Sequence, residues 1–180
     1  MKNDLFSIGP FTVHGYGLMI AIGVLSAYYM VEYRAKKKQM DWEKVFPLTV
    51  WSVLGGFLGS KILYLLTRLP DILANPALLG SSIKDGFVVY GGIIGGILTA
   101  WIYCKCTKWN FWKIFDIAMP AVAMAQGFGR IGCLLAGCCY GIELDPANPI
   151  GIVFHNSAYA PNDVALLPTQ IISSVLDFAN

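Results

Sequence analysis

Charged side chains are scarce in this chain of 180 residues. Asp, Glu, Lys and Arg make up 13% of the sequence, whereas a soluble domain usually carries about a quarter. A solvated globular protein is therefore excluded. The same low charge, with 56% hydrophobic and 13% aromatic residues, excludes a disordered chain. The net charge of +2 is small and dispersed, so no nucleic acid is expected among the partners.

The sequence also lacks the cysteine patterns of a disulfide framework or a structural zinc site. Its five cysteines are an odd number, and the two well-spaced pairs of a zinc site are absent. We therefore predict no metal and no cofactor. For Cys133, Cys138 and Cys139, packing as small apolar residues is the default. A disulfide from Cys133 to Cys138 or Cys139, or a reactive thiol beside Arg130, stays open.

Long apolar stretches are what the sequence does have. A helix crosses a bilayer with about 20 apolar residues, and four stretches meet this length: residues 11–31, 45–67, 86–104 and 114–136. The stretch 168–180 is too short, so we expect the start of a helix that this chain, as a fragment of a longer protein, does not complete. The predicted fold is an all-α integral membrane protein. It forms a single membrane domain over residues 1–180, a helical bundle of four full spans plus the start of a fifth.

Basic residues are divided unevenly between the two ends of these spans. With the N-terminus outside, the inner segments hold eight Lys and Arg residues, Arg34, Lys36, Lys37, Lys38, Lys44, Lys105, Lys108 and Lys113, and the outer ones hold three, Lys2, Arg68 and Lys84. The positive-inside rule therefore predicts an N-terminus outside. Residues 141–167 then lie outside as an external cap or substrate-binding loop.

Two charged residues lie within the fourth span. A charge at the bilayer centre costs at least ~2.5–3.5 kcal/mol, so each needs a partner or a function. Arg130, flanked by Gly129 and Gly132, has a planar guanidinium that matches a phosphate. We interpret it as an anion site for a phospholipid at the outer leaflet; snorkelling to the interface or pairing with a carboxylate are the alternatives. Asp116 is interpreted as a structural N-cap at the inner start of the span.

Further polar side chains lie at the same depth as Arg130. Tyr16 and Tyr90 belong to the outer ends of their spans, where aromatic belts are common. His14 lies beside Tyr16, and Lys61 either snorkels or supports the anion site. Glycine pairs with small-xxx-small spacing predict close helix packing: Gly55 with Gly59, Gly91 with Gly95, and Gly92 with Gly96. Gly91 and Gly92, directly after Tyr90, also leave room for a lipid headgroup.

Several motifs occur in order along almost the whole chain. They are Val13-His14-Gly15-Tyr16-Gly17, Gly55-Gly56 with Ile62-Leu63-Tyr64, Tyr90-Gly91-Gly92-Ile93-Ile94-Gly95, Asp116-Ile117-Ala118-Met119-Pro120, Gly129-Arg130-Ile131-Gly132 continuing to Gly137 and Tyr140-Gly141, and Pro168-Thr169-Gln170. In order and spacing, these motifs resemble those of the bacterial prolipoprotein diacylglyceryl transferases.

This resemblance implies a seven-helix, multi-pass enzyme of the bacterial plasma membrane. Such an enzyme moves the diacylglyceryl group of phosphatidylglycerol onto the lipobox cysteine of a prolipoprotein and releases glycerol phosphate, a step of lipoprotein biosynthesis. By the resemblance, Arg130 binds the phosphate and Tyr16 lines the same site, and Tyr90 and Tyr16 are the catalytic candidates. The residues expected to bind the phospholipid are Arg130, Gly91, Gly92, His14, Lys61 and Gly141.

The chain departs from the family pattern at five positions. Tyr90 stands where the family has His, and Leu167 replaces the His before Pro168. In the signature after Arg130, Cys133 and Ala136 replace two Asn residues and Cys138 replaces the acidic residue. The alternative hypothesis is therefore a non-catalytic or altered-substrate relative that binds an anionic phospholipid at the outer leaflet.

Overall fold

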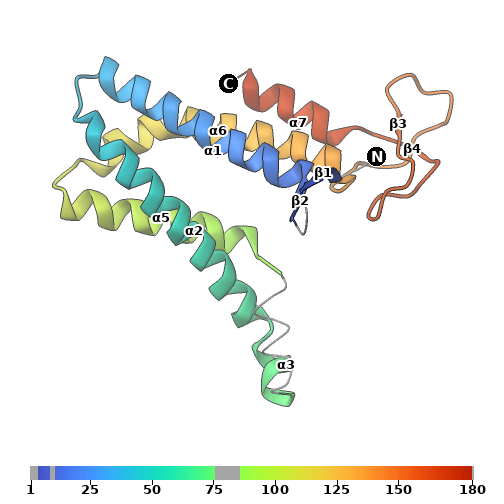
Figure 1. Ribbon diagram of the computed structural model, residues 1–180, viewed down its shortest axis with the longest axis horizontal. Coiled ribbons are helices and arrows are strands. Elements are labelled where there is room, and N and C mark those ends of the chain that lie inside the picture. Colours follow the sequence, from blue (N-terminus) through green and yellow to red (C-terminus); the bar gives the residue numbers. More distant parts are fainter. Residues whose placement is uncertain (1–3, 9–10, 76–85, 180) are drawn as a thin grey trace. The chain divides into compact units, whose positions relative to one another are not determined.

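The computed structural model describes residues 4–8, 11–75 and 86–179, which are mostly helical (Figure 1). Lys2, Lys84 and Asn180, which enter the predictions above, lie outside the described residues. The elements are β1 (Asp4–Ile8), β2 (Phe11–His14), α1 (Gly15–Lys37), η1 (Trp42–Lys44), α2 (Val45–Thr67), α3 (Leu69–Ala74), α5 (Val89–Cys106), α6 (Phe111–Ala136), β3 (Ile152–Val153), β4 (Ala165–Leu166) and α7 (Thr169–Phe178).

Four of these helices are long and apolar enough to cross a membrane: α1, α2 with η1, α5 and α6. This agrees with the four predicted spans, and the protein is a multi-pass membrane protein. In α2 and α5 only 11% of the most apolar window is buried, as expected of helices that contact lipid.

The helix boundaries differ from the expected ones where short strands or turns replace helix. The first helix begins at Gly15 rather than at residue 11, because Phe11–His14 pairs with β1 as an antiparallel strand. A second antiparallel pair joins β3 to β4. The all-α prediction therefore needs correction to a mostly helical fold with two small β pairs among the described residues.

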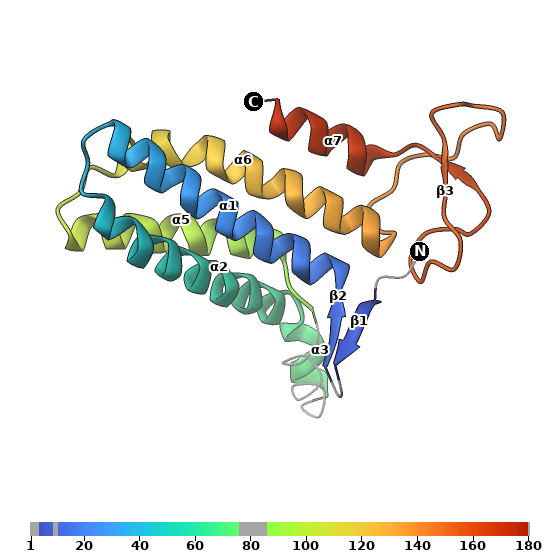
Figure 2. The same cartoon turned by 45° about the horizontal axis from the view of Figure 1, so that its top comes forward.

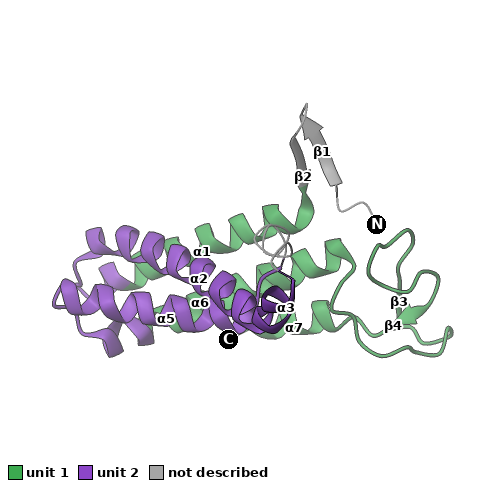
Figure 3. Cartoon of the chain, turned by 90° about the horizontal axis from the view of Figure 1, so that it is seen from below, with its two compact units in different colours: residues 1–34, 117–180 green, residues 35–116 purple. Residues whose placement is uncertain are grey.

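The chain divides into two compact units, coloured separately in Figure 3. Unit 1 contains residues 1–34 and 117–180, and unit 2 contains residues 35–116.

In unit 2, α2 and α5 pack antiparallel through glycines, side by side in Figure 2. A Cβ atom on Gly59 would overlap the carbonyl oxygen of Gly91, and one on Gly95 would overlap that of Gly55. The two backbones are therefore in direct contact, which confirms the close packing expected for these pairs. Just before α5, the Ser60 hydroxyl donates to the Val88 carbonyl at 2.8 Å.

In unit 1, α6 lies between α1 and α7 (Figure 2). A Cβ atom on Gly23 of α1 would lie 3.0 Å from the Ala125 carbonyl oxygen, so α1 and α6 also approach closely. On the other side, Gly127 of α6 faces the Phe178 ring, and Gln126 Nε2 donates to Asp177 Oδ1 at 3.3 Å. Gln170, at the start of α7, is hydrogen-bonded to the Cys138 carbonyl just after α6, so α7 runs antiparallel to α6.

The segment between α6 and α7 folds around a small apolar core of its own. Phe154, Ala160 and Leu166 are buried and pack against Leu134 of α6. The β3–β4 pair and a bridge between Glu143 and Leu166 fix its backbone. Residues 141–167 therefore pack against the end of α6 through this core.

Candidate functional site

Arg130 lies half-buried on α6 in unit 1. Its side chain forms no ion pair or hydrogen bond with any residue that the structure describes. Beside it, nothing lies within 4 Å of the point where Gly129 would carry a Cβ atom. A cation that is partly removed from water and adjoins open space can bind an anionic ligand from outside the chain.

Tyr16 lies in the first turn of α1 and packs on the α6 turn that carries Arg130. A Cβ atom on Gly132 would lie 3.1 Å from Cδ2 of Tyr16 and 3.3 Å from Cβ of Met19. Because Gly132 has no side chain, the Tyr16 ring reaches the α6 backbone, and its phenol remains partly exposed. The structure therefore brings Tyr16 and the Arg130 turn together within unit 1.

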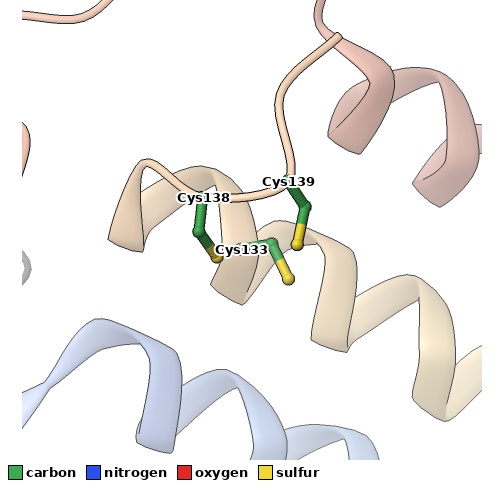
Figure 4. Close-up of side chains that lie close together, drawn as sticks. All are labelled: Cys133, Cys138 and Cys139. Carbon is green, nitrogen blue, oxygen red and sulfur yellow. The ribbon is translucent and has the colours of Figure 1, made fainter. Parts of the chain in front are cut away.

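Three cysteines gather where α6 ends. Cys133 lies in the last turn of α6, and Gly137, with φ of 71°, ends the helix. The backbone N–H of Cys138 donates to the Cys133 carbonyl at 3.0 Å, which folds the chain back over the helix. The Sγ atoms of Cys133, Cys138 and Cys139 all lie within 4.8 Å of one another (Figure 4). All three are free thiols.

The start of α7 holds this turn in place. Gln170 Nε2 donates to the Cys138 carbonyl at 2.8 Å, and Thr169 Oγ1 donates to the Cys139 carbonyl at 2.8 Å. Burial raises the pKa of the Cys138 thiol, and Cys139 adds to this increase. Such a thiol stays protonated at neutral pH, the opposite of the activated thiol considered from the sequence. Gln170, fully buried, was not predicted as a site residue, although the Pro168-Thr169-Gln170 motif marked its position.

Gly141 is explained by packing at the same junction. Its N–H donates to the Leu167 carbonyl at 3.0 Å, and a Cβ atom would meet Leu167 and Thr169 at 2.8–2.9 Å. Only glycine fits this approach, so its role in lipid binding stays a prediction.

The remaining binding candidates lie in unit 2, apart from His14. Lys61 Nζ donates to the Gly86 carbonyl at 3.2 Å and lies 4.6 Å from the centroid of the Phe87 ring, so it holds the segment that leads into α5. Gly91 packs on Gly59 and Leu63. The nearest atom to a Cβ on Gly92 would be the Gly56 carbonyl oxygen at 3.5 Å, an ordinary contact.

Tyr90 and His14 are both exposed. Tyr90, in the first turn of α5, is 75% exposed and forms no hydrogen bond with a described residue. His14 is the last residue of β2. Their roles in binding and catalysis stay predictions.

The N-cap interpretation of Asp116 is wrong, because α6 begins at Phe111 and Asp116 lies in its second turn. Its carboxylate instead accepts a hydrogen bond from Lys38 Nζ at 2.8 Å. Both side chains are about half exposed or more, so this ion pair contributes little stability.

A cavity of about 300 Å³ lies elsewhere, within unit 2. Its lining residues are Trp101, Cys104, Lys105, Trp109, Asn110, Phe111 and Trp112. None of the predicted site residues contributes to it.

The fold and the candidate site together define a multi-pass helical membrane protein with an arginine, available for an anion, inside one of its spans. A family model described as prolipoprotein diacylglyceryl transferase matches residues 3–180. The chain therefore belongs to the prolipoprotein diacylglyceryl transferase family.

Individual relatives agree with this family. The chain is 45% identical to phosphatidylglycerol–prolipoprotein diacylglyceryl transferase of Clostridium tetani over 99% of its length and 70% of the relative. It is 43% identical to phosphatidylglycerol–prolipoprotein diacylglyceryl transferase 2 of Clostridium perfringens, over 99% of the chain and 69% of the relative. For the Dehalococcoides mccartyi enzyme of the same name the identity is 32%, over 92% and 63%.

Proposed function

We propose that this protein transfers the diacylglyceryl group of phosphatidylglycerol to the lipobox cysteine thiol of prolipoproteins in the bacterial plasma membrane. The observation that carries the proposal is Arg130, a half-buried guanidinium without an acidic partner among the described residues, next to the open space at Gly129. Family membership supplies the reaction, and Arg130 supplies the place for the phosphate.

The reaction needs a cation where the negative charge develops. The thiol sulfur attacks the glycerol carbon that bears the phosphate ester, a thioether forms, and the carbon–oxygen bond breaks. Glycerol phosphate leaves with the bonding electron pair, and the thiol proton passes to a base. A guanidinium that holds two phosphate oxygens stabilises this leaving group more in the transition state than in the bound lipid.

Tyr16 borders the phosphate position in this proposal, because it packs on the turn of α6 that contains Arg130. Tyr90 stays a catalytic candidate for accepting the thiol proton; the alternatives are another base or a thiol that ionises unaided. The N-terminus is proposed to lie outside, so that the end of α6 and residues 141–167 meet the outer leaflet, where a prolipoprotein presents its cysteine.

The test is mass spectrometry of a lipobox peptide incubated with membranes that contain the protein and phosphatidylglycerol. A thioether-linked diacylglyceryl adduct, with release of glycerol phosphate, supports the transferase. Bound phosphatidylglycerol with an unmodified thiol supports instead the alternative of a phospholipid-binding relative.

Replacement of Arg130 by Lys tests the phosphate site in the same assay. We expect kcat/KM to fall by about 10- to 100-fold, because a point charge loses one of two charge-assisted hydrogen bonds worth ~1.5–3 kcal/mol. Arg68→Lys is the matched control, since Arg68 is exposed and pairs with Asp71 outside the site. Near-normal turnover of Arg130→Lys removes Arg130 from phosphate binding.

A further inference from the structure

We propose that Cys133, Cys138 and Cys139 form a binding site for one thiophilic d10 metal ion, zinc(II) or copper(I). Their sulfurs already lie within 4.8 Å of one another. With metal–sulfur bonds of about 2.3 Å, sulfurs around one ion are roughly 3.8–4.0 Å apart, so closure onto an ion needs sulfur shifts of less than about 1 Å. Three soft ligands satisfy a trigonal copper(I) ion, or leave zinc(II) one position for a fourth ligand.

The backbone that carries the thiols is held before any ion binds. The Cys138 N–H is bonded to the Cys133 carbonyl, and the carbonyls of Cys138 and Cys139 are bonded to Gln170 and Thr169. Cys139 adopts φ of 58°, a left-handed conformation that is rare for residues other than glycine and asparagine. These bonds hold the two loop sulfurs over Cys133, so little conformational entropy remains to be lost when an ion binds.

Gln170 ties the cluster to the rest of unit 1. Its side chain is fully buried, and its Nε2 is bonded to Cys138 while its Oε1 has no hydrogen-bond partner among the described residues. The buried Gln170 amide thus orients the cysteine turn through its hydrogen bond to Cys138. Metal ligands are commonly oriented by hydrogen-bonded neighbours of this kind.

Binding exchanges thiol protons for the metal ion. The thiols that ligate lose their protons to solvent, and a metal–sulfur bond replaces each S–H bond. Protons and the metal ion compete for the same sulfur atoms, so we expect affinity for the ion to rise with pH.

The experiment is a titration of the reduced, metal-free full chain in detergent with cobalt(II) chloride. We expect one equivalent to bind with sulfur-to-cobalt charge-transfer absorption. Cys133→Ser, Cys138→Ser and Cys139→Ser each weaken binding by about 100-fold or more, since even groups behind the ligands are worth 10- to 100-fold. Cys106→Ser is the control, because this exposed cysteine lies outside the cluster.

Displacement of cobalt then identifies the ion. Zinc(II) chloride and a copper(I) salt should each remove the absorption. The ion that displaces cobalt at the lower free concentration binds more tightly and is the preferred ion. Cys139 is exposed, so Cys139→Ser keeps the test valid if Cys133→Ser fails to fold. The proposal is overturned if the reduced protein shows no charge-transfer band, or if the band survives in Cys139→Ser. The readout does not involve lipid transfer, so the site and the proposed function fail independently.

Discussion

Tyr90 is one of the five positions at which the sequence departs from the motif pattern that it resembles. Its side chain is 75% exposed in the first turn of α5 and forms no hydrogen bond with a described residue. A phenol can transfer a proton or orient a lipid, and it cannot do either without its hydroxyl group.

Replacement of Tyr90 by Phe separates these roles from packing. If Tyr90 takes the thiol proton, kcat falls by about 100-fold or more, the usual size of a general-base contribution, while phosphatidylglycerol still binds. Stopped assays of thioether formation measure the rate. Tyr159→Phe, which changes an exposed tyrosine between α6 and α7, is the matched control. An unchanged rate assigns Tyr90 to packing only.

Single residues also show what sequence patterns can predict. The unusual position of Arg130 followed from the cost of a charge inside an apolar stretch, and the structure leaves it without a described acidic partner. Asp116 was assigned to the wrong place because helix starts are uncertain by several residues, and its partner Lys38 lies 78 residues away in sequence. For the cysteines, the sequence indicated at most a pair, Cys133 with Cys138 or Cys139. The end of α6 and the reversed turn after it bring all three sulfur atoms together.

At the scale of elements, the α2–α5 pair depends on glycines that leave no space between the backbones. Gly59 contacts Gly91, and Gly55 contacts Gly95. Gly96, on the same face, is different, because the nearest atom to its Cβ would be the Ser52 carbonyl at 3.5 Å. A glycine-to-alanine substitution can therefore be compared at a tight contact, Gly59, and at an ordinary contact, Gly96.

Gly59→Ala should destabilise the protein by about 1–3 kcal/mol, because the added methyl group overlaps the Gly91 carbonyl and the helices must separate. Thermal unfolding in detergent, followed by circular dichroism, measures this loss. Gly96→Ala is the control and should unfold at nearly the wild-type temperature. Equal unfolding temperatures for the two variants would contradict a backbone contact at Gly59.

The helices were easier to predict than the segment between α6 and α7. Each span is a long apolar run, a signal that needs no periodicity. The strands β3 and β4 have two residues each, too few for an alternating pattern. The buried core of Phe154, Ala160 and Leu166 is assembled from separate parts of the segment, so its composition indicated only a cap or a loop.

At the scale of the whole molecule, the direction of insertion is a prediction from the basic residues. Lys36, Lys37 and Lys38 follow the first span, and residues 141–167 contain no Lys or Arg. The positive-inside rule therefore places the first group in the cytoplasm and the second segment outside.

Labelling with a membrane-impermeant maleimide on intact cells tests this orientation. In chains with all other cysteines replaced by Ser, Tyr159→Cys should react from outside, and Cys106 should react only after permeabilisation. Both positions are exposed, so a difference reports on the side of the membrane. Labelling of Cys106 alone in intact cells would mean the opposite orientation.

The glycine contact between α2 and α5 has a consequence for how this helix pair responds when the surrounding lipid changes with temperature. Bacteria alter their acyl chains as they warm or cool, which changes the lateral pressure on every span. A contact between main-chain atoms has no side-chain torsions through which to yield to that pressure. We expect α2 and α5 to move together as one rigid helix pair, so that the distance between their axes is the same in fluid and in ordered lipid.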